Sequence, residues 1–331
     1  LAMAYIIAVN PSMMVVAGMP FEAALTATCV GAAIMTILMG VIANRPIALA
    51  SGMGINAIVA YTLCAAGNGV DWRVAMAVVF CEGIVILILV LCGLRKAVMD
   101  AIPVSLRRAI GIGIGLFIAF IGLKGGGIVA SDASTYLALG DLTSGTCIVA
   151  IISILLAVIL QAMNVRGALL ISIILATVVG IPLGVTQMPS SWNFGLDFSA
   201  FAAPFQTDPA TGTIAIAQVV LQPALLLMVF SLLMSDFFDT MGTVVAVGQQ
   251  ADFTDKDGNV ADIQAILTVD SAAAAVGGLV GASSITSFVE STSGAAAGAR
   301  TGLSNIVIGI LFFLCAFIAP IVGMVYSAAT C

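Results

Sequence analysis

Residues 281–300 read GASSITSFVESTSGAAAGAR, and the interpretation of the whole chain depends on this stretch. It lies between two long apolar segments, yet it is rich in hydroxyl groups and glycine and contains one carboxylate, Glu290. Small residues let backbones approach closely, and hydroxyl groups can satisfy backbone that leaves a helix inside a membrane. A carboxylate at membrane depth is costly and usually functional. We therefore predict that Glu290 lies in a substrate site.

The composition indicates a membrane protein. Of 331 residues, 62% are hydrophobic and only 8% are charged, whereas a soluble domain has about 25% charged residues. We predict an all-α polytopic protein of the cell membrane (inner or plasma), embedded in the lipid bilayer. The ten basic residues are scattered and form no patch, which argues against nucleic acid as a partner. The cysteine spacing matches no metal motif, and no cofactor is expected.

Apolar windows of about 17–25 residues mark candidate membrane spans. The eleven predicted spans cover residues 1–16, 22–44, 47–61, 74–93, 109–123, 146–163, 167–181, 218–247, 262–280, 281–300 and 303–326. A polar connection occupies residues 182–217. The chain begins and ends within apolar sequence, so we expect it to be a fragment of a longer protein.

The basic residues predict the orientation of these spans. If the segment after the second span is cytoplasmic, the outer loops contain only Arg73 and Lys124. The inner loops then contain Arg45, Arg95, Lys96, Arg107, Arg108, Arg166, Lys256 and Arg300. This is the bias that the positive-inside rule predicts for a correct span count. It makes residues 182–217 an extracytoplasmic connection.

The third and tenth spans share an unusual design. Each starts with a short extended piece, at 47–51 and 283–288, and continues through small residues into a Gly/Ala-rich helix. The two lie seven spans apart, and an odd number of spans inverts the second copy. Transporters built on inverted repeats bring such interrupted segments together near the midplane, with N–H groups facing one cavity. Asn56 and Glu290 then lie in the first turns of two half-helices, unless both spans are merely Gly-rich packing helices.

Five acidic residues fall inside the predicted spans rather than at their ends: Glu82, Asp236, Asp239, Asp270 and Glu290. Each costs about 2.5–3.5 kcal/mol at mid-helix, and no basic residue lies inside a span to pair with them, since Arg300 stands at the end of its span. Because histidine is absent, proton transfer must use carboxylates. Asp236 and Asp239 are three residues apart and so share a helical face. One of two close acids tends to hold a proton, so this pair is a candidate proton carrier.

Other polar and aromatic residues in the spans have two open interpretations. Asp270 either caps or binds within the helix bundle or belongs to the site. Asn10, followed by Pro11, either lines the cavity or marks a kink. Three aromatic residues flank the acids and suit stacking on a planar ring, although packing against other helices is the more common use. These are Phe237, Phe238 and Phe288.

Four motifs resemble one known family. They are YIIAVNP (5–11), NRPIALASGMGINA (44–57), DFFDTMGT (236–243) and SFVESTSGAAAGARTG (287–302). The chain is similar to the AzgA-type adenine/guanine/hypoxanthine permeases of the xanthine/uracil permease (nucleobase–cation symporter) superfamily. The resemblance runs in order through the whole chain. One departure is Ser51, where the family pattern has proline, and it concerns the geometry of the third span.

The resemblance implies a fold of two inverted seven-span repeats, of which this chain covers about eleven of fourteen spans. Residues 1–93 correspond to the core domain of the first repeat and 105–181 to its gate domain. Residues 182–217 form the connection, and 218–326 form the core of the second repeat, without its gate helices. The family also implies a homodimer and an elevator-like movement of the core.

The same resemblance implies roles for individual residues. Glu290 corresponds to the substrate-binding acid of the tenth span and Asp239 to the acid of the eighth, with Asp236 as the alternative alignment. Asn56 corresponds to the polar residue that starts the third half-helix. The predicted substrate site consists of Glu290, Asp239, Asn56, Phe288, Thr286 and Gly54. The predicted proton-coupling residues are Asp236, Asp239 and Glu290.

We therefore predict a proton-coupled importer of purine nucleobases rather than an enzyme. A uracil or xanthine permease is the closest alternative. An anion transporter of the same fold needs a positive site, and the spans contain none. An intramembrane aspartyl hydrolase could use Asp236 and Asp239, but catalytic carboxylate pairs normally come from two separate elements. A passive channel is a further alternative.

Overall fold

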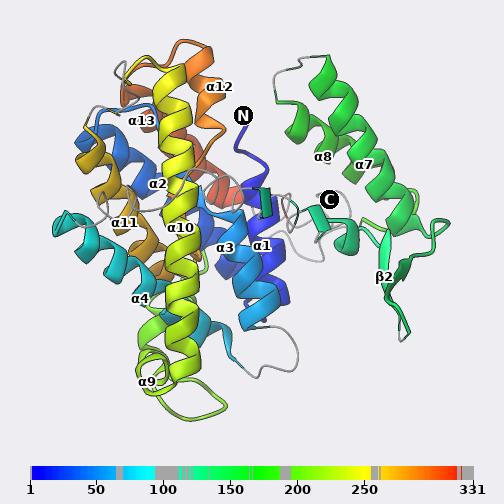
Figure 1. Cartoon of the computed structure of the whole chain (residues 1–331). Helices are drawn as coiled ribbons and strands as arrows, with labels where there is room; N and C mark the ends of the chain where they lie inside the picture. The colour runs from blue at the N-terminus through cyan, green and yellow to red at the C-terminus, as the bar shows by residue number, and fades with distance from the viewer. Residues whose placement is uncertain are drawn as a thin grey trace.

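The computed structural model describes residues 2–64, 70–93, 112–113, 116, 119–120, 122–132, 134–163, 165, 167–186, 195–254, 260, 262–318 and 322. It is a helical bundle with two short sheets (Figure 1). In chain order the elements are α1 (Ile6–Val16), α2 (Phe21–Ile42), β1 (Leu49–Ser51), α3 (Met53–Ile58), the π-helical turn η1 (Val59–Leu63), α4 (Trp72–Leu91), β2 (Val129–Asp132), β3 (Tyr136–Leu139), α7 (Gly145–Ala162), α8 (Ala168–Gly180), the 3-10 turn η2 (Ala203–Phe205), α9 (Ala215–Leu221), α10 (Pro223–Gln250), α11 (Ile263–Val280), β4 (Ile285–Ser287), α12 (Ser291–Ala296), α13 (Leu303–Cys315) and the 3-10 turn η3 (Ala316–Ile318).

The helices have the length and composition of membrane spans. Within the described residues, α2, α4, α7, α10 and α11 each have at least 18 residues and are apolar enough to cross a bilayer. Shorter apolar helices occupy the places of four other predicted spans, at Ile6–Val16, Met53–Leu63, Ala168–Gly180 and Leu303–Ile318. The predicted span at 109–123 lies largely outside the described residues. The prediction of a multi-pass helical membrane protein is confirmed.

The two irregular spans meet in a buried sheet. Strands β1 and β4 pair antiparallel, with Leu49 opposite Ser287 and Ser51 opposite Ile285. All six strand residues are buried. Backbone hydrogen bonds extend the pairing at both ends, from Gly52 N to Ser284 O at 2.8 Å and from Phe288 N to Ala48 O at 3.0 Å. The predicted extended pieces are therefore confirmed, and each continues into a short helix, α3 or α12.

The start of the eighth span differs from the prediction. Residues 218–221 belong to a separate short helix, α9, and α10 begins only at Pro223. Gln222 between them has an extended conformation, with φ −108° and ψ 110°. The residue before a proline is driven away from the helical region, and proline itself starts a helix well. The apolar window extended across this break because both sides of it are hydrophobic.

A second sheet lies in a segment for which the sequence analysis predicts no structure. Strands β2 and β3 form a hairpin in which Val129 lies opposite Leu139 and Asp132 opposite Tyr136. The carboxylate of Asp132 closes the turn by accepting hydrogen bonds from the backbone N–H groups of Ser134 and Thr135, both at 2.8 Å. The prediction relies on long apolar windows, and two strands of four residues each contain no such window.

Helices α7 and α8 pack mainly against each other, apart from the main bundle (Figure 1). Their contact has its own small core of Val149, Ala150 and Ala176. The main bundle is formed by α1–α4 and α10–α13, which share the larger buried clusters. The described part of the chain therefore contains a main bundle and a separately packed pair of helices.

The most extensive helix contact in the described part of the chain joins α4 and α11. Glycine residues allow these two backbones to touch. A methyl group at Gly278 would lie 2.5 Å from the backbone nitrogen of Phe80, and one at Gly83 would overlap the backbone of Ala275. Such close packing of small residues is how helices associate strongly inside a membrane.

We predict that Gly278→Ala lowers the stability of the purified protein by about 1–3 kcal/mol, because the added methyl group overpacks the contact. The measurement is the thermal unfolding midpoint in detergent. Gly242→Ala, in the middle of α10, is the matched control because nothing lies within 4 Å of its added methyl group. Alanine favours a helix over glycine, so the control should be at least as stable as the parent. Equal midpoints for the two variants would contradict the prediction.

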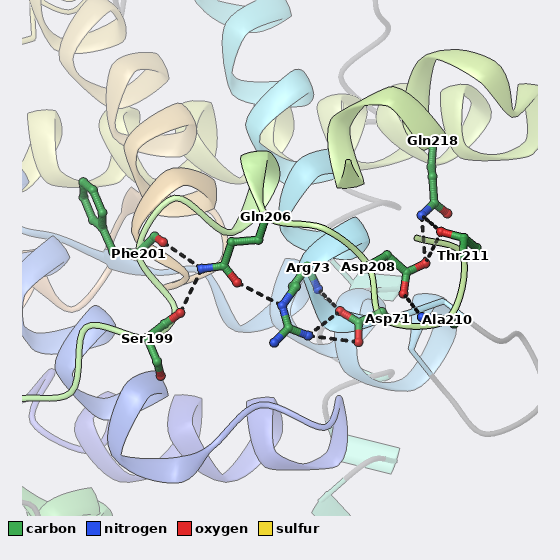
Figure 2. Close-up of polar contacts among 9 residues, drawn as sticks. All are labelled: Asp71, Arg73, Ser199, Phe201, Gln206, Asp208, Ala210, Thr211 and Gln218. Carbon is green, nitrogen blue, oxygen red and sulfur yellow. Dashed lines mark hydrogen bonds and ion pairs between the residues drawn. The ribbon is translucent and has the colours of Figure 1, made fainter. Parts of the chain in front are cut away.

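The segment 195–222 is bonded to the core helices (Figure 2). Arg73, at the start of α4, donates from Nε to Gln206 Oε1 at 2.9 Å, and Gln206 donates to the carbonyls of Ser199 and Phe201, both at 2.9 Å. Three further contacts fix the segment. Asp197 N donates to Thr26 Oγ1 on α2 at 3.1 Å, Ala202 N donates to Leu279 O on α11 at 2.7 Å, and the rings of Phe205 and Phe80 meet edge to face.

Candidate functional site

The structure places Glu290 directly between β4 and α12, half-buried at the end of the tenth-span strand. Its carboxylate is held by Tyr5, which lies just before α1 and is 6% exposed. The Tyr5 hydroxyl donates to Glu290 Oε1 at 2.6 Å. Tyr5, just before the helix of the first span, therefore orients Glu290 in the tenth span.

Asp239 lies on α10, which contacts both β4 and α12. Its side chain is exposed, and it is close enough to Asp270 and Glu290 to interact with them electrostatically. Tyr5 is within electrostatic range of both Asp239 and Glu290. Asp236, one turn earlier, is fully buried instead. The structure thus brings Asp239 and Glu290 together, and of the two aspartates it leaves Asp239 accessible.

The sequence leaves two interpretations of Asp270 open. In the structure this residue, on α11, connects β4 and α10 to its own helix. It is completely buried on α11. Its Oδ1 accepts from the backbone N–H of Ser287 at 2.9 Å and from the Ser287 hydroxyl at 2.7 Å, and its Oδ2 accepts from Thr240 on α10 at 2.7 Å. Asp270 therefore binds within the bundle and fixes β4 against α10 and α11.

We predict that Asp270→Asn destabilises the protein by about 1–3 kcal/mol. The asparagine amide would turn its NH₂ group toward either Ser287 or Thr240, which are donors themselves, so one side of the junction would lose its acceptor. Thermal unfolding of the purified variant measures this loss. Asp252→Asn is the control, because the Asp252 side chain is 80% exposed in a surface ion pair and such pairs contribute little. A loss no larger than that of the control would show that the junction is dispensable.

Two other predicted substrate residues lie beneath the surface of the site. Thr286 is 1% exposed, and its hydroxyl lies 2.9 Å from that of Thr240. Phe288 is 5% exposed and packs in the large hydrophobic cluster. Both are part of the buried support of β4 in this structure. Their proposed contact with substrate remains a prediction.

Asn56 lies in α3 and is fully buried. Its amide N–H donates to Asn10 Oδ1 at 2.7 Å, and Asn10 donates in turn to Thr28 Oγ1 at 2.7 Å and Ser51 Oγ at 3.1 Å. Helix α1 continues through Pro11. The hydrogen bonds of Asn10 place it in a buried polar cluster between α1, α2, β1 and α3. Ser51, the departure from the family pattern, supplies one member of this cluster. Gly54 is half-buried in the same helix.

The charge distribution shows what the site can bind. Among the described residues, the three arginines lie in ion pairs at the ends of spans, Arg45 with Asp262, Arg73 with Asp71 and Arg300 with Asp252. The hydrogen-bond partners of Glu290 and Asp270 are instead hydroxyl groups, from Tyr5 for Glu290 and from Thr240 and Ser287 for Asp270. Carboxylates in such surroundings accept hydrogen bonds from N–H donors or take up protons, and they repel anions.

Two cavities lie elsewhere in the described part of the molecule. A cavity of about 440 Å³ lies beside Trp72 and Arg73, and one of about 370 Å³ lies beside Val30 and Phe201. Both are away from Glu290. In the part of the chain that the structure describes, no group of three acidic or cysteine side chains has the arrangement of a metal site. The site is therefore defined by its acids and their hydrogen bonds.

Sequence reasoning missed Tyr5 as a site residue, although Tyr5 opens one of the motifs that carry the family resemblance. It also left the place of Asp270 open. A tyrosine at the edge of an apolar run gives no local signal of a partner 285 positions away. The buried serine and threonine residues around Asp270 were the available clue to its role, because an acid inside a bundle needs donors.

Comparison with known proteins gives a consistent result along the whole chain. The family model Xan_ur_permease, a permease family, matches residues 1–330. A protein of Methanocaldococcus jannaschii is 40% identical over 330 residues, covering 100% of this chain and 73% of that protein. The adenine permease AdeP of Escherichia coli is 37% identical, with 99% of this chain and 72% of AdeP covered. The guanine/hypoxanthine permease PbuO of Bacillus subtilis is 36% identical, with 99% and 74% covered.

The fold also has a solved counterpart. The transmembrane domain of a cyanobacterium bicarbonate transporter, BicA, superposes with a TM-score of 0.72 at 15% sequence identity. The match covers 97% of this chain and 82% of that domain. At this identity the likeness concerns the fold alone.

Proposed function

The chain belongs to the Xan_ur_permease family, and we propose that it is a permease for the purine nucleobases adenine, guanine or hypoxanthine. Membership makes it a multi-pass membrane transporter and not an enzyme. Relatives more than a third identical over almost the whole chain are an adenine permease and a guanine/hypoxanthine permease. The motifs around Asp239 and Glu290 support the same substrate class.

The observation that carries this proposal is the juxtaposition of Glu290 and Asp239 beside Tyr5. A purine base is a flat ring with N–H groups along its edges and no charge. Two carboxylates from different elements, one on α10 and one between β4 and α12, can accept two of those N–H groups at once. Glu290 is half-buried and Asp239 exposed, so both can reach a ligand, whereas Asp236 and Asp270 are completely buried.

We propose Asp239 as the acid that carries the coupled proton. No hydrogen bond to Asp239 from a described residue stabilises its charge, whereas Asp270 accepts three. Asp239 also lies within electrostatic range of two other acids, Asp270 and Glu290, and acids gathered within membrane spans are where proton carriers are found. A proton that enters with the base would remove one negative charge from the site and make its movement across the membrane less costly. Their binding is then thermodynamically linked.

The finer architecture is also a proposal. The antiparallel pairing of β1 with β4 and the separate packing of α7 and α8 support two inverted repeats with core and gate domains. In this arrangement the chain provides both core halves and the first gate. The core would move as an elevator against the gate, within a homodimer.

An anion substrate is disfavoured despite the similarity to a bicarbonate transporter, because the accessible side chains at the site are acids. Uracil or xanthine remains the alternative within the family. A competition panel of unlabelled bases against labelled hypoxanthine distinguishes these substrates directly.

We predict that Glu290→Gln and Asp239→Asn each reduce the initial rate of hypoxanthine uptake at least about tenfold, the effect of losing one hydrogen bond to a charged group. Uptake is measured in cells that express the protein and lack their own purine permeases. Glu22→Gln, in the first turn of α2, is the matched control and should transport at the parent rate. Parent-like uptake by both site variants would place the substrate site elsewhere.

We predict further that a protonophore abolishes accumulation of hypoxanthine above its external concentration. A proton symporter needs the gradient to concentrate substrate, whereas a passive channel only equilibrates it. The internal concentration of labelled base is measured with and without the protonophore at equal expression. Concentrative uptake that survives collapse of the gradient would refute proton coupling.

A further inference from the structure

A cavity of about 370 Å³ lies between α2, the segment 195–222 and the end of α11, and none of the acids of the candidate site lines it. Apart from Thr26 and Asp197, all its lining residues are apolar, among them Val30, Ile34, Phe198 and Phe201. An apolar cavity of about 150 Å³ holds a benzene ring. This larger one therefore has room for part of a hydrocarbon chain.

The polar groups at this cavity are few, and one of them is charged. The Thr26 hydroxyl accepts a hydrogen bond from Asp197 N at 3.1 Å, and Asp197 Oδ1 accepts one from Ser199 N at 2.8 Å. Asp197 Oδ2 accepts none from a residue in the described part of the chain. A nucleobase needs several polar partners around its ring, which this lining does not provide. The cavity suits a ligand with an apolar body and one cationic donor.

Helix α2 presents an apolar face to the surroundings of the bundle. Ile34, Leu38 and Val41 are exposed and recur at the spacing of one helical face. Since α2 is long and apolar enough to cross a bilayer, this face is suited to contact with hydrocarbon. Ile34 belongs both to this face and to the lining of the cavity. The cavity is therefore reached from the lipid-facing side of the helix.

The segment 195–222 brings two exposed aromatic rings to the same place. Phe198 and Phe201 are 55% and 53% exposed, although they belong to a connection between spans. Gathered apolar surface of this kind marks contact with a membrane or a partner. Thr26 and Ile34 lie about 12 Å apart along the axis of α2, so the cavity extends from the carboxylate of Asp197 toward the middle of the span.

We propose that this cavity binds an acyl chain of a membrane lipid whose headgroup carries a primary ammonium group, as that of phosphatidylethanolamine does. The chain lies against Val30, Ile34 and the two phenylalanine rings, and the ammonium group donates to Asp197. The lipid joins α2 to the segment 195–222 where a hydrogen bond already connects them. The inference concerns lipid binding and does not depend on which substrate the protein transports.

The charge of Asp197 distinguishes lipids that have the same acyl chains. An ammonium group is attracted to a carboxylate and provides N–H donors for it. A phosphoglycerol headgroup is negatively charged and contains no cation, so the carboxylate repels it. A choline headgroup has the positive charge but no N–H group to donate. The proposal therefore requires a preference for one headgroup, and general affinity for apolar chains does not satisfy it.

The test measures lipid binding to the full-length protein by native mass spectrometry. Phosphatidylethanolamine and phosphatidylglycerol with identical acyl chains are titrated separately against the delipidated protein. Phosphatidylethanolamine should bind about fivefold more tightly, the upper end of the effect of a partly exposed ion pair. In Asp197→Asn the two lipids should bind equally, because asparagine keeps an acceptor for Ser199 N but loses the charge. Asp252→Asn, which alters an 80% exposed carboxylate elsewhere, should keep the preference of the parent.

Val30→Trp tests where the chain lies, and it gives a result even if Asp197→Asn fails to fold. The larger side chain fills the cavity and should weaken the binding of phosphatidylethanolamine about tenfold, the effect of leaving two methylene groups unburied. Val41→Trp is the matched control, since it adds the same side chain to the exposed face of α2 outside the cavity. It should bind the lipid as the parent does.

Three results overturn the proposal. Equal affinities of the parent for the two lipids, or an unchanged preference in Asp197→Asn, would show that the carboxylate does not recognise the headgroup. Parent-like binding by Val30→Trp would place the lipid outside the cavity. A dimer that Val30→Trp dissociates, visible in the same mass spectra, would show that a second copy of the chain covers the cavity instead.

Discussion

The antiparallel contact between β1 and β4 is the constraint on which the rest of this structure depends. Two strands of three residues meet inside a membrane protein, where an unpaired backbone group has no water to bond to. Their mutual pairing and the donors and acceptors around them satisfy that backbone. Ala48 N donates to Ser291 Oγ, and Leu49 N donates to Thr36 Oγ1. The hydroxyl-rich character of the tenth span follows from this requirement as much as from substrate binding.

The acids divide between support and recognition. Asp270 is enclosed by donors and holds β4 to α10 and α11, whereas Glu290 and Asp239 stand at the accessible edge of the same junction. The structure thus places a buried, hydrogen-bonded acid beside two accessible ones. The buried junction positions the strand, and the strand positions Glu290 for a ligand.

Much of this arrangement could be predicted from the sequence, because the decisive signals are local. Extended pieces at 47–51 and 283–288 are visible as small and hydroxyl-bearing residues that interrupt apolar windows, and both form strands. The break at Gln222 had a local signal in Pro223, but hydropathy alone conceals a break with apolar residues on both sides.

The Tyr5–Glu290 bond could not be predicted in this way, since it depends on how the first and tenth spans pack in three dimensions. Asp236 and Asp239 differ in exposure for the same reason: their spacing defines a helical face, and only packing decides which part of that face is covered.

Hydrogen bonds attach the segment 195–222 to α2, α4 and α11. Gln206 uses both ends of its amide, one on Arg73 of α4 and one on the carbonyls of Ser199 and Phe201 (Figure 2), while Asp208 organises the adjoining turn with Gln218. A surface patch fixed in this way to α2, α4 and α11 is carried along by any displacement of those helices relative to α7 and α8. If the core moves as proposed, an antibody fragment that recognises this patch together with the α7–α8 side would distinguish the positions of the core without any label in the membrane.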